Sequence, residues 1–138
     1  MKHPILVQKY GGSSVANPER IKRVAQRVVA AERQGYRVVV VVSALGDTTD
    51  ELLELARQIS LSPPERELDM LMATGEQVSV ALLAMAIEEL GEDAISFTGA
   101  QVGILTDSSH TKAKLLDINN KRIVEELSKG RIVIVAGF

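Results

Sequence analysis

Five consecutive valines, Val38-Val39-Val40-Val41-Val42, decide the fold class of this chain. A strand that is apolar at every position has to be covered on both faces, which is typical of a strand inside a parallel sheet. Residues 132–136 form a similar run near the other end of the chain, and shorter apolar runs lie at residues 5–8 and 94–97. The sequence therefore predicts strands in these four segments.

Helical patterns separate the predicted strands. Between residues 18 and 34, apolar residues recur at spacings of three and four, after Asn17 as a predicted N-cap and before Gly35 as a stop signal. Such alternation of strands and helices predicts an α/β fold, a three-layer αβα sandwich around a mainly parallel central sheet. The apolar positions of this first helix are Ile21, Val24, Ala25, Val28 and Val29.

Three further helices are expected. One begins near Asp47 and carries apolar residues to residue 59, and a last one spans about residues 119–128. Between them the helical pattern covers residues 65–90, with a predicted break at Gly75. The part after the break is the most apolar helix, and we expect it to be buried centrally. Its predicted apolar face consists of Val78, Ala81, Leu82, Met85, Ala86 and Leu90.

The composition excludes several classes of function. The 138 residues, 46% of them hydrophobic and 25% charged, fit one globular domain. A net charge of -2 with only two Phe and two Tyr argues against a nucleic-acid partner. There is no cysteine, and His3 and His110 are too few for a His-rich metal centre, so any metal should arrive with a phosphate ligand. The longest apolar stretch, residues 80–87, is short for a membrane span, and no signal peptide is visible, so we expect a cytoplasmic protein without a membrane partner.

The first candidate site is the tetrad Lys9-Tyr10-Gly11-Gly12, which is followed by Ser13. A strand delivers the lysine, two glycines let the backbone approach an anion, and a helix start supplies amide donors, so the segment predicts a phosphate site. Neither a nucleotide P-loop nor a Gly-x-Gly-x-x-Gly motif occurs in the chain. A plain turn with a solvated lysine is the alternative, because short motifs of this kind are weak signals.

The second candidate, residues 43–50, follows the carboxyl end of the valine strand, where ligands of open α/β sheets bind. It contains Ser43, Asp47, Thr48 and Thr49. Aspartate and threonine are also the residues that helix caps require, and both roles can coexist.

Glu76 is the third candidate. It follows Gly75 at the start of the most apolar segment, where an acid in a first helical turn complements the helix dipole. The helix dipole does not explain why a carboxylate lies in such apolar surroundings. A carboxylate there needs a cationic partner, such as the ammonium of an amino-acid substrate. The fourth candidate, residues 98–103, is interpreted mainly as glycine-containing turns, and His110 as a surface or turn residue.

Taken in order, these segments resemble the N-terminal part of the aspartate kinases, in the amino-acid kinase fold family. Two small departures are Ser13, where threonine is common, and Leu45, where methionine is frequent. The resemblance covers essentially the whole chain. The matching segments are Val7-Gln8-Lys9-Tyr10-Gly11-Gly12-Ser13-Ser14-Val15, Val42-Ser43-Ala44-Leu45-Gly46-Asp47-Thr48-Thr49-Asp50-Glu51-Leu52-Leu53, Thr74-Gly75-Glu76-Gln77-Val78-Ser79, Ser96-Phe97-Thr98-Gly99-Ala100-Gln101-Val102-Gly103 and Val135-Ala136-Gly137-Phe138.

The resemblance implies transfer of the γ-phosphoryl group of ATP, with Mg²⁺ held through the phosphates, to the side-chain carboxylate of L-aspartate, the first step of Lys, Thr and Met biosynthesis. By this analogy Lys9 is the catalytic cation, and Glu76 pairs with the aspartate ammonium. The implied phosphate-binding residues are Lys9, Gly11, Gly12, Ser13 and Ser43. The implied aspartate-binding residues are Asp47, Thr48, Thr49 and Glu76.

The resemblance also implies that residues 1–138 are the N-terminal portion of a kinase domain, without its remainder and without regulatory ACT domains. We therefore expect the chain to be inactive alone, and we expect the parent enzyme to be a homo-oligomer. Two alternatives stay open. One is another amino-acid kinase, acting on glutamate, acetylglutamate, carbamate or UMP, and the other is a non-catalytic binding or assembly module.

Overall fold

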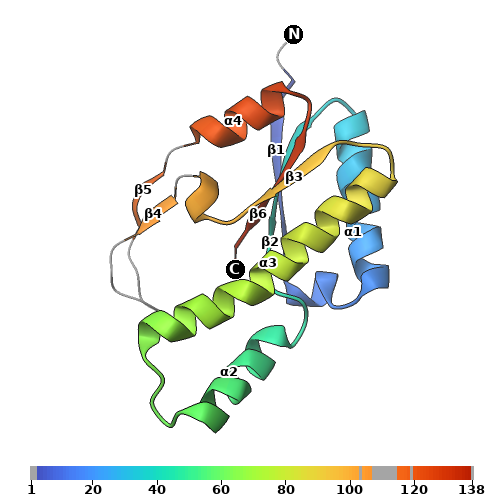
Figure 1. Cartoon of the computed structure of the whole chain (residues 1–138). Coiled ribbons are helices and arrows are strands. Elements are labelled where there is room, and N and C mark those ends of the chain that lie inside the picture. Colours follow the sequence, from blue (N-terminus) through green and yellow to red (C-terminus); the bar gives the residue numbers. More distant parts are fainter. Residues whose placement is uncertain (1–2, 103, 107–114, 119, 138) are drawn as a thin grey trace.

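The computed structural model describes residues 3–102, 104–106, 115–118 and 120–137 (Figure 1). Strands and helices alternate along most of the chain, as the sequence predicts. In chain order the elements are β1 (Ile5–Tyr10), the 3-10 helix η1 (Gly12–Val15), α1 (Pro18–Arg33), β2 (Arg37–Val42), α2 (Thr48–Ile59), α3 (Glu65–Glu89), β3 (Ala94–Phe97), η2 (Ala100–Val102), β4 (Ile104–Thr106), β5 (Leu115–Ile118), α4 (Lys121–Ser128) and β6 (Ile132–Ala136).

Four parallel strands form the main sheet, in the order β1-β2-β6-β3. In the register of this sheet Lys9 lies opposite Val41, and Val41 lies opposite Val135. The valine strand β2 and the strand β6 are the two inner strands, which explains why both are apolar at every core position. The predicted α/β class with a mainly parallel sheet is confirmed.

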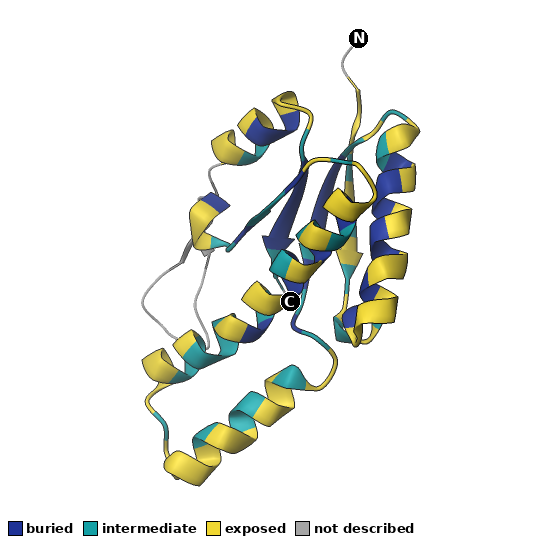
Figure 2. Ribbon diagram, turned by 45° about the vertical axis from the view of Figure 1, so that its right-hand side comes forward, coloured by how far each residue is buried: buried dark blue, intermediate teal, exposed yellow. Residues whose placement is uncertain are grey.

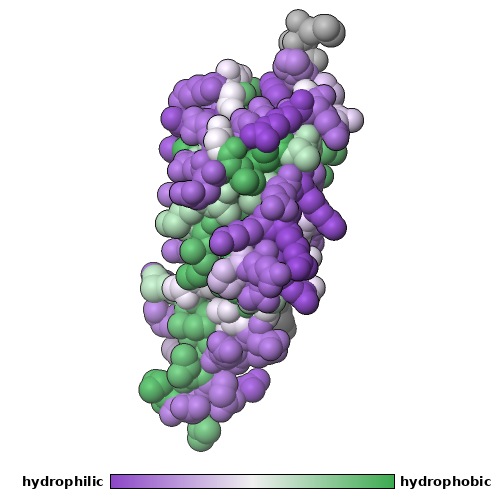
Figure 3. Space-filling view, turned by 90° about the vertical axis from the view of Figure 1, so that its right-hand side faces the viewer, coloured by the Kyte–Doolittle hydropathy of each residue, from purple (hydrophilic) through white to green (hydrophobic). Residues whose placement is uncertain are grey.

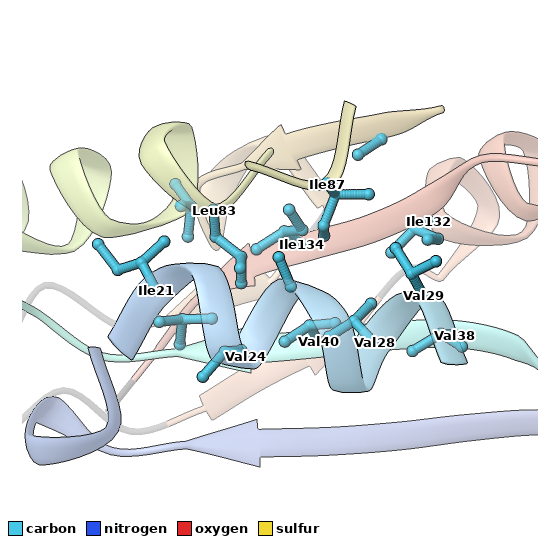
Figure 4. Close-up of a cluster of buried hydrophobic side chains, with 14 of the residues drawn as sticks. Ile21, Val24, Val28, Val29, Val38, Val40, Leu83, Ile87, Ile132 and Ile134 are labelled. Carbon is cyan, nitrogen blue, oxygen red and sulfur yellow. The ribbon is translucent and has the colours of Figure 1, made fainter. Parts of the chain in front are cut away.

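Both faces of the inner strands are covered. On one face, alternate residues of β2 and β6 pack against α1 and α3, and Figure 4 shows Val40 and Ile134 between Val28 and Leu83. On the other face, Val39 and Val133 pack with Phe97, Val102 and Leu127 of β3, η2 and α4. The layers therefore run helix, sheet, helix, as predicted.

The first helix, α1, has the cap and the buried face that the sequence predicts. Asn17 accepts a hydrogen bond through Oδ1 from the Arg20 amide at 2.9 Å, and Pro18 occupies the first turn. All five predicted apolar positions are buried, together with Ala31. In Figure 2 the dark blue residues of α1 face the sheet.

The helical hairpin made by α2 and the first half of α3 is much less buried. No residue of α2 is buried, and Leu55 and Ile59 are 56% and 89% exposed. Figure 1 shows α2 standing away from the sheet, and Figure 2 shows it without buried residues. Apolar side chains consequently reach the surface at this lower end of the molecule, where Figure 3 shows green atoms.

Two expectations for the third helix are wrong. The predicted break at Gly75 does not exist, because α3 runs without interruption from Glu65 to Glu89. The predicted apolar face is also not the packed one, since Val78 and Met85 are 48% and 61% exposed. The helix is apolar almost all round, so the sequence pattern could not select the buried side. Its buried residues are Gly75, Ser79, Val80, Leu83 and Ile87.

By length and composition alone, α3 is also long enough and apolar enough to cross a membrane, which among the described helices is true of this one only. This is weak support for a membrane span, because a core helix passes the same test. In this fold the helix packs on the sheet through Val80, Leu83 and Ile87.

The sequence analysis missed strand β5, which pairs antiparallel with β4 in a separate two-stranded sheet. The predicted turn residue His110 lies outside the described residues, as does Phe138.

Candidate functional site

The candidate residues gather at one edge of the sheet. Since β1, β2, β6 and β3 are parallel, the segments that follow them all leave at the carboxyl edge. The Lys9 loop follows β1, residues 43–49 follow β2, and residues 98–100 follow β3. Strands lie about 4.8 Å apart, so the strand carrying Lys9 is roughly 10 Å from β6 and roughly 14 Å from β3. The edge thus divides into a β1–β2 part and a β6–β3 part.

In the β1–β2 part, Lys9 lies near the end of the edge strand and is exposed. Gly11 has an extended backbone and precedes η1, and no side chain caps the start of this short helix. A Cβ built on Gly11 would meet nothing within 4 Å, so open space surrounds it. Ser13 is exposed, and its backbone is held by a side chain of α1: Arg20 Nη1 donates a hydrogen bond to the Ser13 carbonyl oxygen at 2.7 Å.

The loop after β2 is fastened to the Lys9 loop by backbone contacts. The Gly46 amide donates to the Gly12 carbonyl at 2.9 Å, and the Ser43 amide donates to the Tyr10 carbonyl at 3.3 Å. A Cβ on Gly12 would lie 3.1 Å from the Ala44 carbonyl oxygen and 3.2 Å from that of Gly46. The second glycine of the tetrad is therefore needed for close approach of the two loops.

The predicted substrate residues begin α2. Asp47 is exposed and occupies the N-cap position, but its side chain makes no capping hydrogen bond, so the capping role considered for it is not seen. Thr49 is exposed, and Thr48 is half-buried with its methyl group toward Gly75. The Ser43 hydroxyl donates to the Ala44 carbonyl at 3.3 Å.

Glu76 belongs to the β6–β3 part of the edge. It lies about three turns inside α3, so the proposed first-turn interaction with the helix dipole is wrong for this residue. It lines a cavity of about 320 Å³, and burial raises the pKa of its carboxyl. A half-buried acid of this kind is stabilised in its charged form by a cationic ligand. The cavity is lined by Ala73, Glu76, Gln77, Thr98, Gly99, Ala100 and Ala136.

The turn after β3 has the structural role predicted for it. The Thr98 amide donates to Gln101 Oε1 at 2.9 Å, and the Gln101 amide donates to Thr98 Oγ1 at 3.3 Å, which is a structural capping arrangement. The same turn also lines the cavity that Glu76 lines. Its place beside Glu76 depends on the strand order, which no local signal reveals.

A phosphate ligand fits the β1–β2 part of the edge. Lys9 offers a charge, and Gly11 leaves space for an anion to approach the backbone. Across the described ranges, no three His, Cys, Asp or Glu residues are grouped so as to hold a metal ion.

Fold and site together define an α/β protein with a candidate ligand site at the carboxyl edge of a parallel sheet. Comparison with known families is more specific. The chain belongs to the amino acid kinase family, whose sequence model matches residues 4–138.

Individual relatives share long stretches of the sequence. The chain is 59% identical to the aspartokinase of Mycobacterium tuberculosis over 134 residues, which cover 97% of this chain and 32% of that protein. It is 52% identical to aspartokinase 2 of Bacillus subtilis, of which it covers 33%. The chain thus spans about a third of the length of these curated relatives. The resemblance to aspartate kinases is confirmed.

Solved structures agree on the fold. The aspartate kinase of Synechocystis superposes with a TM-score of 0.83 at 51% identity, over 98% of this chain and 22% of that one. E. coli aspartokinase III in complex with aspartate and ADP gives a TM-score of 0.83 at 21% identity, over 98% of this chain and 40% of that one. At this lower identity the likeness concerns the fold alone.

Proposed function

We propose that this chain is the N-terminal part of the catalytic domain of an aspartate kinase, which transfers the γ-phosphoryl group of ATP to the side-chain carboxylate of L-aspartate. Identities of 52% to 59% with aspartokinases support the proposal. One structural observation carries it. The hydrogen bond from Gly46 to Gly12 joins the two polar loops at the carboxyl edge, beside the cavity that contains Glu76.

The chemistry of the acceptor suits the residues present. An aspartate side chain has a pKa of about 3.9, so it is ionised at neutral pH and needs no general base. In a loose phosphoryl-transfer transition state, negative charge spreads over the transferred group. Preorganised cations and backbone amides are effective in stabilising that charge. A site that positions the two substrates and stabilises this charge is therefore sufficient for the reaction.

Each part of the edge has its own role in the proposal. Lys9 stabilises the transferring group, with Gly11, Gly12, Ser13 and Ser43 around the phosphates. Mg²⁺ is bound through the ATP phosphates, where it neutralises part of their charge.

The aspartate end of the site is assigned to the start of α2 and the middle of α3. Asp47, Thr48 and Thr49 hold this end of the substrate, and Glu76 pairs with its α-ammonium. The half-buried position of Glu76 and the exposed Asp47 side chain, which does not cap α2, support this assignment.

An acceptor series tests the proposal in the full-length protein. ADP formation is measured with aspartate, glutamate, acetylglutamate, carbamate and UMP as acceptors, and hydroxylamine trapping detects the acyl phosphates. We expect aspartate to be preferred, with formation of aspartyl hydroxamate. Preference for another acceptor would assign the chain to a different amino acid kinase.

The isolated chain is predicted to lack kinase activity, because it spans about a third of its relatives. The measurement is ATP-dependent aspartyl phosphate formation by purified residues 1–138, with calorimetric titration of aspartate and of Mg-ATP alongside. Turnover by the isolated chain would contradict the prediction. Saturable binding without turnover, in a full-length protein that is also inactive, would favour a binding module instead.

Three further properties belong to the proposal. We expect the full-length protein to be cytoplasmic and homo-oligomeric, with regulatory ACT domains after the kinase domain. Light scattering of the full-length protein tests the oligomeric state, and its sequence beyond residue 138 tests the domain arrangement.

A further inference from the structure

Gly75 lies where α3 comes closest to the loop after β2. A Cβ built on Gly75 would be 3.1 Å from Ala44 Cβ and 3.2 Å from Thr48 Cγ2. Both distances are shorter than ordinary van der Waals contact, so an added methyl group would require its neighbours to shift by a few tenths of an ångström. Gly75 is buried in the interior of α3.

Ala44 connects this contact to the phosphate loop. It is 6% exposed, and its carbonyl oxygen would lie 3.1 Å from a Cβ on Gly12. The residues from Ser43 to Gly46 are therefore packed between the Lys9 loop on one side and α3 on the other. These close contacts fix the spacing of the three segments, because well-packed segments leave little room to shift.

A glycine in a helix interior needs such a reason. Glycine destabilises a helix relative to alanine, because the unfolded chain loses more backbone freedom on folding. Here the absence of a side chain allows α3 to approach Ala44 and Thr48, so a tertiary contact offsets the weaker helix propensity. The residue that had indicated a helix break is instead a packing residue.

We propose that Gly75 is a positioning residue. Because it has no side chain, α3 packs directly against Ala44, and this contact sets the distance between the phosphate loop and the Glu76 carboxylate. This inference rests on the proposed function. Because Glu76 is the next residue, any displacement of α3 at Gly75 carries Glu76 with it. Small misplacements of a substrate-binding group have large effects on reaction rates and binding.

The substitution Gly75→Ala in the full-length protein tests the proposal. We expect the KM for aspartate to rise about tenfold and the KM for ATP to change less than about twofold. The melting temperature should change little, because the better helix propensity of alanine opposes the cost of the tighter contact. A residue with a purely structural role would lower the melting temperature and affect both substrates alike. Met70→Ala is the matched control on α3, since Met70 is 58% exposed, and it should leave both KM values unchanged.

A compensating substitution at Ala44 tests the contact between Gly75 and Ala44 itself. Ala44→Gly removes the nearest Cβ, so the double variant Gly75→Ala/Ala44→Gly should recover an aspartate KM within about threefold of the unsubstituted protein. If Gly75→Ala fails to fold, recovery of soluble protein in the double variant supports the contact, and failure of both overturns it.

The outcomes separate this inference from the function on which it rests. An unsubstituted full-length protein that does not phosphorylate aspartate would overturn the proposed function and this inference with it. An active protein whose Gly75→Ala variant keeps its aspartate KM, or is not rescued by Ala44→Gly, would overturn the inference alone.

Discussion

The helices α1 and α2 look alike in sequence but are held differently in the molecule. Both have apolar residues at helical spacing after a residue suited to capping. In α1, Asn17 makes the capping hydrogen bond and six residues are buried against the sheet. In α2, Asp47 makes no such bond and no residue is buried. The comparison indicates that a side-chain cap and core packing hold α1 in place, whereas α2 has neither.

The largest expected difference concerns the apolar faces of the two helices. Ile21→Ala on α1 should lower the free energy of unfolding by about 2 to 5 kcal/mol, because Ile21 is 4% exposed and its removal leaves a cavity. Leu55→Ala on α2 should change it by less than about 0.5 kcal/mol, since Leu55 is 56% exposed. Urea denaturation of the chain measures both, and equal losses would remove the distinction between the helices.

A substitution at Lys9 tests whether the carboxyl edge of the sheet has a functional role rather than a structural one. Lys9→Ala in the full-length protein should lower kcat by roughly 100- to 1000-fold, the effect of losing one preorganised group that stabilises transferring charge. The melting temperature should stay unchanged, because Lys9 is exposed. An active variant would return Lys9 to the role of a solvated lysine.

Glu76 tests the assignment of the aspartate end of the site. Glu76→Gln in the full-length protein should raise the KM for aspartate by roughly 10- to 100-fold with a smaller change in kcat, because a charged hydrogen bond to the ammonium is lost. Steady-state kinetics at varied aspartate measures this. The KM for ATP is the internal control, and a parallel rise in both values would argue against the pairing.

The same residue has a predicted effect on stability. Burial raises the pKa of Glu76, so the stability contributed by its neutral form is fully present below the unfolded pKa and is lost as the pH rises through the folded pKa. Glutamine stays neutral throughout. Relative to the parent, Glu76→Gln should therefore gain stability between about pH 4 and about pH 7 in the absence of aspartate. Melting temperatures of both proteins across this range are the measurement.

The smallest expected effects on stability distinguish the two predicted N-cap residues, Asn17 and Asp47. Asn17→Ala should lower the free energy of unfolding by about 1 kcal/mol, because the hydrogen bond to the Arg20 amide is lost. Asp47→Ala should have no comparable effect on stability, since its side chain caps nothing. Asp47→Ala should instead raise the aspartate KM in the full-length protein. A loss of stability at Asp47 equal to that at Asn17 would show that both are caps.

Much of the fold could be predicted from the sequence. The run Val38 to Val42 is apolar at every position, so it had to be an inner strand, and it is. The buried face of α1 followed from strict helical spacing with charged residues between. The candidate loops followed from their positions after strands, because the carboxyl ends of parallel strands share one edge.

The sequence by itself determined the α/β class, the inner strands and the loops that carry the candidate site. Only the tertiary structure decided that α3 is continuous, which of its faces is buried and that Asp47 caps nothing. The physical reason is that these features depend on neighbours distant in sequence. Gly75 is tolerated in a helix because Ala44 and Thr48 lie against it, and no local pattern contains that contact.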